Sequence, residues 1–163
     1  MGTGKSTVGR LLAERLDREF VDTDQLIESR HGSIPTIFAT VGEAAFRAIE
    51  RELAVELAAR DNLIIATGGR LLLDPANEEA LDDTGLIYCL TATEEEILER
   101  VQGGPGLATR PMLAGGNPRQ RILELLGERA EAYAAFEQVS TSGRTPALVA
   151  EDLAGLATQP LRQ

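Results

Sequence analysis

The chain has few of the residues that carry redox and metal chemistry. Its 163 residues include one cysteine, Cys89, and one histidine, His31. A single cysteine excludes an intramolecular disulfide, and in the apolar segment LIYCL we expect Cys89 to be a buried structural thiol. A single histidine leaves nothing from which to build a histidine-based metal centre or a catalytic triad. A reducing, cytoplasmic location is therefore expected.

Long apolar runs and excess positive charge are also absent. No run approaches the ~20 apolar residues of a membrane-spanning helix, and 26 acidic against 16 basic residues give a formal net charge of -10. This charge disfavours sequence-independent binding to nucleic acid or to an anionic membrane. The length suits one compact domain over residues 1–163, which we expect to be a monomer.

The residues that are present predict alternating helices and strands. Helical spacing of apolar residues favours helices over 5–16, 43–60 and 118–136, with others after 26, 93 and 145. Strands are expected at 20–21, 63–67, 86–90 and 139–141. The apolar runs at 63–67 and 86–90 are typical of strands buried on both faces of a parallel sheet. This alternation predicts an α/β fold with a doubly wound parallel sheet.

The opening residues MGTGKST match the second half of a phosphate-binding loop, G-x-x-x-x-G-K-[ST]. Backbone amides of such a loop face phosphate oxygens, and the following helix adds the positive end of its dipole. Lys5 would reach the β- and γ-phosphates, and the Ser6 hydroxyl would hold magnesium. The first glycine of the pattern and the strand before it would precede Met1. We therefore expect the natural protein to begin roughly ten residues earlier.

Two further segments suggest ligand binding. In DTD, Asp22 and Asp24 would lie on one side of an extended segment, where a cation or a hydroxyl group can bind between them. A solvated turn or a helix N-cap is the alternative interpretation, above all for Asp24. Gly68 and Gly69 follow a strand, at the edge where open α/β sheets bind ligands, and let a ligand approach the backbone closely.

Three arginines add positive charge to these segments. Arg110 lies in the glycine- and proline-rich stretch 103–117, which we interpret as a mobile lid that closes on transferring phosphates. Arg47 and Arg129 lie on expected helices. Each, taken alone, is compatible with an ordinary exposed arginine, and Arg47 would then pair with Glu50 three residues later.

Taken in order, these segments resemble the shikimate kinase family over nearly the whole chain. The motifs are GTGKST for the phosphate loop, DTDQLIE, GSIPTIFATVGEAAFRAIE, ATGG, TRPML in the lid, ERAEAY, and GRTP near the adenine. No single motif is decisive, but their joint order is specific. The combination of D-T-D, F-R and G-G distinguishes this family from other nucleotide kinases of the same fold.

The resemblance implies an ATP:shikimate 3-phosphotransferase with a parallel sheet of strand order 2-3-1-4-5 and with Mg²⁺ as cofactor. It implies ATP binding by Gly2, Thr3, Gly4, Lys5, Ser6, Thr7, Arg110 and Arg144. It implies magnesium binding by Ser6 and Asp22, and shikimate binding by Asp24, Arg47, Gly68, Gly69 and Arg129. The catalytic residues would be Lys5, Asp24 and Arg110, with Asp24 orienting the attacking hydroxyl and accepting its proton.

Two departures from the family pattern stand out. Arg70 occupies the position of a usual third glycine, so a long cation would lie beside the substrate pocket and perturb binding. The central first strand is absent, which would expose the edges of both neighbouring strands. Two alternatives stay open: a related small-molecule kinase acting on gluconate or a nucleoside monophosphate, and a non-catalytic kinase-like module. The arginine pair together with DTD favours shikimate as the acceptor.

Overall fold

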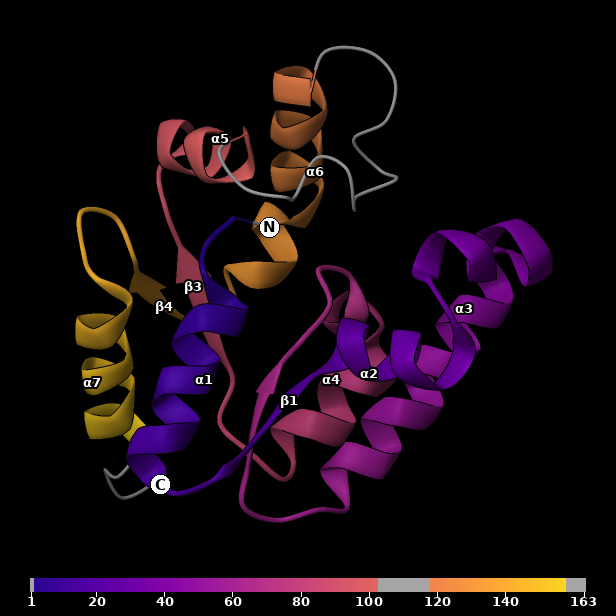
Figure 1. Cartoon of the computed structure of the whole chain (residues 1–163), viewed down its shortest axis with the longest axis horizontal. Coiled ribbons are helices and arrows are strands. Elements are labelled where there is room, and N and C mark those ends of the chain that lie inside the picture. Colours follow the sequence, from indigo (N-terminus) through magenta and orange to yellow (C-terminus); the bar gives the residue numbers. More distant parts are fainter. Residues whose placement is uncertain (1, 103–117, 158–163) are drawn as a thin grey trace. The chain divides into compact units, whose positions relative to one another are not determined.

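The computed structural model describes residues 2–102 and 118–157. The chain divides into two compact units, each described by itself below (Figure 1). The large unit comprises Lys5–Ile87 and Thr145–Gln163, and the small unit comprises Met1–Gly4 and Tyr88–Arg144. The expected lid at 103–117, with Arg110, lies outside the described residues. No described helix is long and apolar enough to cross a membrane.

The large unit is built on two parallel strands with helices around them. Its elements are α1 (Lys5–Leu16), β1 (Glu19–Asp22), α2 (Thr23–His31), α3 (Ile34–Ala58), β2 (Leu63–Ala66), the 3-10 turn η1 (Leu71–Leu73), α4 (Pro75–Asp82) and α7 (Pro146–Ala157). The strands pair in register from Glu19 opposite Leu63 to Asp22 opposite Ala66. Helix α1 packs against α7 and β2, and α3 packs against α2 and α4. Buried apolar side chains from these elements form the core, among them Val8, Leu12, Ile27, Leu53, Leu57, Leu71 and Val149.

Local capping explains where these helices begin. The Asp22 carboxylate accepts a hydrogen bond from the amide of Gln25 at 3.3 Å and starts α2. Ser33 caps α3 in the same way, with proline in the first turn. Gly42 interrupts α3 with φ of 82° and ψ of 173°, a left-handed conformation that favours glycine. Helix α3 is therefore two helical segments, one on each side of Gly42.

The small unit contains a second pair of parallel strands. Its elements are β3 (Tyr88–Thr91), α5 (Glu94–Gln102), α6 (Pro118–Tyr133) and β4 (Glu137–Ser140), and Tyr88 lies opposite Glu137 in the strand pair. Helices α5 and α6 pack through the buried side chains Ile97, Leu98, Val101, Ile122 and Leu125. The expected capping box is present, since the Thr93 and Glu96 amides each donate to the other's side chain at 3.3 Å.

The expected α/β class with parallel strands and flanking helices is confirmed. The expected order 2-3-1-4-5 counts the strand expected before Met1 as strand 1, so β1, β2, β3 and β4 correspond to strands 2, 3, 4 and 5. The observed pairs β1–β2 and β3–β4 are the neighbours 2-3 and 4-5 of that order. Within the part of the chain that the structure describes, β2 pairs only with β1 and β3 only with β4.

Several details of the sequence prediction are wrong. The extended DTD segment is one, because α2 begins at Thr23 as soon as Asp22 caps it, and Asp24 lies in the first helical turn. Helix α3 starts at residue 34, and α4 was not predicted although Asp74 caps it ahead of a proline. The strand segment 63–65 and Cys89 are half-buried and not fully buried as expected, and among the described residues each of these strands has a partner on one side only.

Candidate active site

The loop before α1 belongs to the small unit up to Gly4 and contacts α5 at Gly2. Gly2 and Gly4 have φ of 71° and 89°, the left-handed region that favours glycine. A Cβ on Gly2 would lie 3.1 Å from the side chains of Ile97 and Val101. The Gly2 carbonyl accepts a hydrogen bond from the Arg100 guanidinium at 3.4 Å. The chain therefore approaches α5 closely at Gly2, and a Cβ there would require these neighbours to shift.

The first residues of α1 meet the end of β1 in the large unit. Lys5, Ser6 and Thr7 form the first turn of α1, and the Ser6 hydroxyl donates to Asp22 Oδ2 at 2.6 Å. A hydroxyl beside a carboxylate is an oxygen pair that suits a hard cation. Among the described residues, no group of three or more His, Cys, Asp or Glu side chains can hold a metal. A magnesium ion at Ser6 and Asp22 would therefore need further oxygens from water and from bound phosphates.

Asp24 and Gly68 lie far apart in sequence and close together in space. The Gly68 amide donates to the buried Thr23 hydroxyl at 2.8 Å, which ties the end of β2 to the start of α2. A Cβ added at Gly68 would collide with Oδ1 of Asp24. Because β1 and β2 run parallel, the segments after them meet at one edge of the pair. Position 68 therefore admits only glycine while Asp24 keeps its place.

Arg47 lies on α3 between two carboxylates. Its Nη1 donates to Glu50 Oε2 at 2.5 Å, which confirms the expected pair. Its Nη2 and Nε both donate to Glu43 Oε1, at 2.9 and 3.3 Å. The guanidinium also lies 5.2 Å from the ring centroid of Phe46. These contacts fix the orientation of Arg47, which is half-buried and not the ordinary exposed arginine of the alternative interpretation.

The charges around Arg47 interact with one another. Burial raises the pKa of Glu50, the hydrogen bond from Arg47 opposes that shift, and the negative charge of Asp24 adds to it. Hydrogen bonds from Arg47 lower the pKa of Glu43. The positive charge of Arg70 adds to the lowering for Glu43 and opposes the rise in the pKa of Glu50. The charges of Asp24, Arg47 and Arg70 therefore influence these two glutamates, and the five side chains form one cluster of interacting charges.

Three residues of this region, Glu43, Glu50 and Thr23, had no predicted role in a site. Glu50 is 2% exposed and Thr23 is 1% exposed. The helical spacing of Glu43 and Glu50 from Arg47 was visible in the sequence. Their difference in burial was not, because burial depends on what packs against α3.

Arg129 and Arg144 belong to the small unit. Arg129 lies on α6 and is 8% exposed, so the interpretation as a solvated helix arginine is wrong. Arginine is almost never buried without compensating contacts. Arg144 follows β4 closely, and its Nη1 donates to the Ser140 carbonyl at 3.3 Å.

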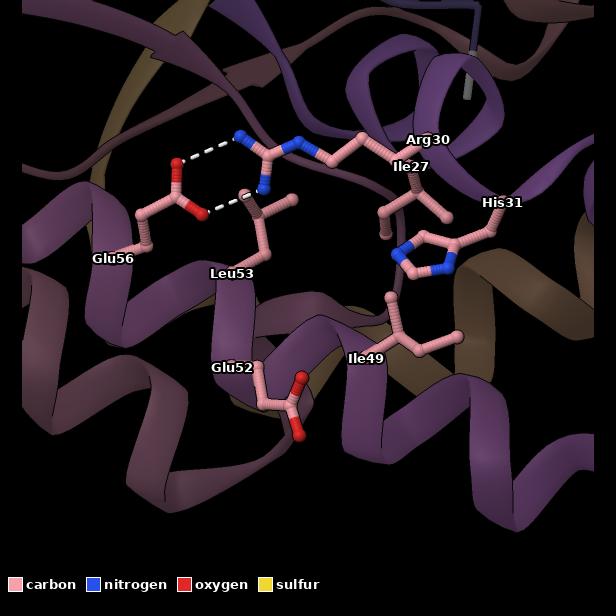
Figure 2. Close-up of a pocket in the computed structure, with 7 residues that line it drawn as sticks. All are labelled: Ile27, Arg30, His31, Ile49, Glu52, Leu53 and Glu56. Atoms are coloured by element: carbon pink, nitrogen blue, oxygen red, sulfur yellow. Dashed lines mark hydrogen bonds and ion pairs between the residues drawn. The ribbon is translucent and has the colours of Figure 1, made fainter.

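A separate pocket lies between α2 and α3 of the large unit. Figure 2 shows its seven lining residues, with Arg30 paired to both oxygens of Glu56 at 2.6 and 2.8 Å. The other lining residues are Ile27, His31, Ile49, Glu52 and Leu53. None of the residues predicted from sequence to bind ATP, magnesium or shikimate lines this pocket.

Comparison with known proteins decides the family. The family model described as shikimate kinase matches residues 1–156. The chain belongs to the shikimate kinase family. It is 47% identical over 161 residues to the shikimate kinase of Gloeobacter violaceus, covering 98% of this chain and 89% of the relative. A shikimate kinase of Thermus thermophilus is 44% identical over 155 residues, covering 94% of this chain and 83% of the relative.

A solved shikimate kinase shares the fold. The structure of the Acinetobacter baumannii shikimate kinase in complex with shikimate matches with a TM-score of 0.87 and 36% identity, covering 96% of this chain and 87% of that one. The family resemblance inferred from the order of the motifs is thus confirmed.

Arg70 stands where the resemblance leads us to expect a third glycine. It directly follows Gly69 and precedes η1, with φ of -130°, a conformation open to any residue. An arginine at this position therefore places no strain on the backbone. Its consequence is electrostatic, because Arg70 adds a positive charge that acts on Glu43 and Glu50.

Proposed function

We propose that the chain transfers the γ-phosphoryl group of ATP to the 3-hydroxyl of shikimate, which yields shikimate 3-phosphate and ADP. The observation that carries this proposal is the meeting of Asp24 and Gly68 beyond parallel strands, with Arg47 in the same cluster of charges. A hydroxylated ring with a carboxylate needs a hydrogen-bond acceptor for its hydroxyls and a cation for its carboxylate. The large unit supplies both. Membership of the family supports the same acceptor.

In this proposal each acceptor-binding residue has a stated part. Asp24 accepts hydrogen bonds from the ring hydroxyls. It also takes the proton of the 3-hydroxyl while the oxygen of that hydroxyl bonds to the γ-phosphorus. The bond from that phosphorus to the β,γ-bridging oxygen breaks, and ADP leaves. Arg47, together with Arg129, binds the carboxylate through paired hydrogen bonds. Gly68 and Gly69 let the ring approach the backbone. Most of the rate enhancement would come from alignment and charge neutralisation.

The donor side rests on the loop before α1. Residues 2–7 would surround the phosphates of ATP, with Lys5 neutralising their charge. Ser6 and Asp22 would hold Mg²⁺, which when bound neutralises charge on the phosphates. Arg110 over the phosphates and Arg144 beside the adenine complete the proposed ATP site. A single kinase domain, a monomeric state and a cytoplasmic location also stay predictions.

A coupled assay of ADP release tests the proposal. We expect ADP release that depends on shikimate and does not occur with gluconate or a nucleoside monophosphate. Asp24→Asn should lower kcat by about 10²–10⁴-fold, the range for loss of a positioned proton acceptor. Arg47→Ala should act mainly on the KM for shikimate. ATP binding without turnover of shikimate would refute the proposal and favour a non-catalytic module.

A further inference from the structure

One edge of Arg47 that suits a carboxylate ligand is already in use. Nε and Nη2, two neighbouring donors on one edge of the guanidinium, both donate to Glu43 Oε1 at 3.3 and 2.9 Å. Such an edge is the part of arginine that receives a carboxylate through two parallel hydrogen bonds. The remaining terminal nitrogen, Nη1, donates to Glu50. A carboxylate that binds Arg47 at this edge must therefore displace Glu43.

The two glutamates differ in how easily they can leave. The side chain of Glu50 is 3% exposed, and separating it from Arg47 would leave a buried charge without its partner. The side chain of Glu43 is 58% exposed, and its pair with Arg47 spans one helical turn at the surface. Exposed pairs of this kind contribute little and exchange with water. Glu50 is thus the fixed partner of Arg47, and Glu43 is the exchangeable one.

Arg70 offers a second cation to Glu43. Arg70 is half-buried and immediately precedes η1, which packs against α3, the helix that carries Glu43. Its positive charge contributes to the lowered pKa of Glu43. Within residues 2–102 and 118–157, the Arg70 guanidinium donates no hydrogen bond and forms no ion pair. No described residue therefore occupies the donors that a carboxylate moving away from Arg47 would use.

We propose that Glu43 occupies the carboxylate-binding edge of Arg47 in the empty site, and that Arg70 receives Glu43 when the acceptor's carboxylate displaces it. This inference rests on the proposed function in taking Arg47 as the ligand of that carboxylate. Glu43 then acts as an internal competitor that weakens acceptor binding. Arg70 offsets part of that competition. Both act through Arg47 and are positioning residues.

The test is a double-mutant cycle in which titration calorimetry measures shikimate binding by the full chain. Glu43→Gln should lower the Kd for shikimate by roughly two- to fivefold, as expected for loss of an exposed ion-pair competitor. The KM for shikimate should fall with it while kcat stays unchanged. Arg70→Ala should raise the Kd by about twofold in the natural background. In the Glu43→Gln background, Arg70→Ala should have no effect.

Glu56→Gln is the matched control. It removes the same charge from the same helix, and Glu56 pairs with Arg30 (Figure 2), whereas Glu43 pairs with Arg47. We expect it to leave the Kd unchanged. This separates displacement at Arg47 from the general effect of lowering a net charge of -10 in a protein that binds an anion.

Three results would overturn the inference. Glu43→Gln could leave the Kd unchanged or raise it, or Glu56→Gln could lower the Kd as much as Glu43→Gln does. Arg70→Ala could also weaken binding equally in both backgrounds, which would mean that Arg70 contacts the acceptor itself. A natural chain that binds shikimate but does not consume ATP would refute only the proposed phosphoryl transfer. A chain that does not bind shikimate would refute both.

Discussion

Replacing Gly68 by alanine should damage activity far more than stability. A Cβ at this position would collide with Oδ1 of Asp24, and ordinary contact requires 3.4 Å or more. The carboxylate must therefore move by about 1 Å, a displacement that can reduce a rate by about 10²-fold when it misplaces a reacting group. We expect Gly68→Ala to lower kcat with shikimate by about that factor.

The same substitution should leave the fold nearly unchanged. Gly68 is not in the left-handed region, and alanine keeps the amide that donates to Thr23. The atom that must move is at the end of a side chain and not in the backbone. We expect the free energy of unfolding to change by less than about 1 kcal/mol. Steady-state kinetics and thermal unfolding of the same preparation measure both quantities.

Two other glycines supply controls. A Cβ at Gly9 would lie 2.7 Å from Cε2 of Phe20, a packing clash between α1 and β1. Gly9→Ala should destabilise the protein by about 1–3 kcal/mol, as overpacking does, with kcat unchanged at temperatures where the protein stays folded. At Gly155, in α7, a Cβ would meet nothing within 4 Å. Gly155→Ala should stabilise by about 0.5–1 kcal/mol.

Two outcomes for Gly68→Ala would refute the reasoning. A kcat within about threefold of the natural enzyme would show that the position of the Asp24 carboxylate does not limit the reaction. A loss of stability as large as that of Gly9→Ala would show that the fold, and not the carboxylate, absorbs the clash.

Two further predictions concern single carboxylates. Asp22→Asn should raise the Mg²⁺ concentration for half-maximal activity by about 10–100-fold without changing stability, because asparagine caps a helix as well as aspartate does; an unchanged magnesium requirement in a titration at fixed ATP would contradict the assignment. Hydrogen bonds from Ser142, Gly143 and Thr93 lower the pKa of Glu96 from 4.5 to about 2. A lowered pKa stabilises the fold above pH 4.5, and this contribution is lost as the pH falls from 4.5 towards 2. In urea unfolding, Glu96→Gln should therefore lose less stability than the natural chain over that interval, and equal losses would show that Glu96 does not contribute.

Local sequence signals predicted much of the fold correctly because their causes are local. Helix α1 was predicted with its bounds, since the periodic residues Val8 and Leu12 are buried. The Thr93 and Glu96 capping box depends on residues three apart and was also predicted. The prediction that DTD is extended was wrong because the Gln25 amide donates a capping hydrogen bond to Asp22, and a helix begins where the strand was expected to continue.

The sequence by itself determined the family, because the order and spacing of seven short motifs carry that information without any knowledge of packing. It also determined the α/β class, through the alternation of periodic helical and apolar segments. Only the tertiary structure decided that Asp24 meets Gly68 and that Arg47 lies between one buried and one exposed glutamate. Such contacts depend on which elements pack together, and burial then sets how strongly each charge holds its partner.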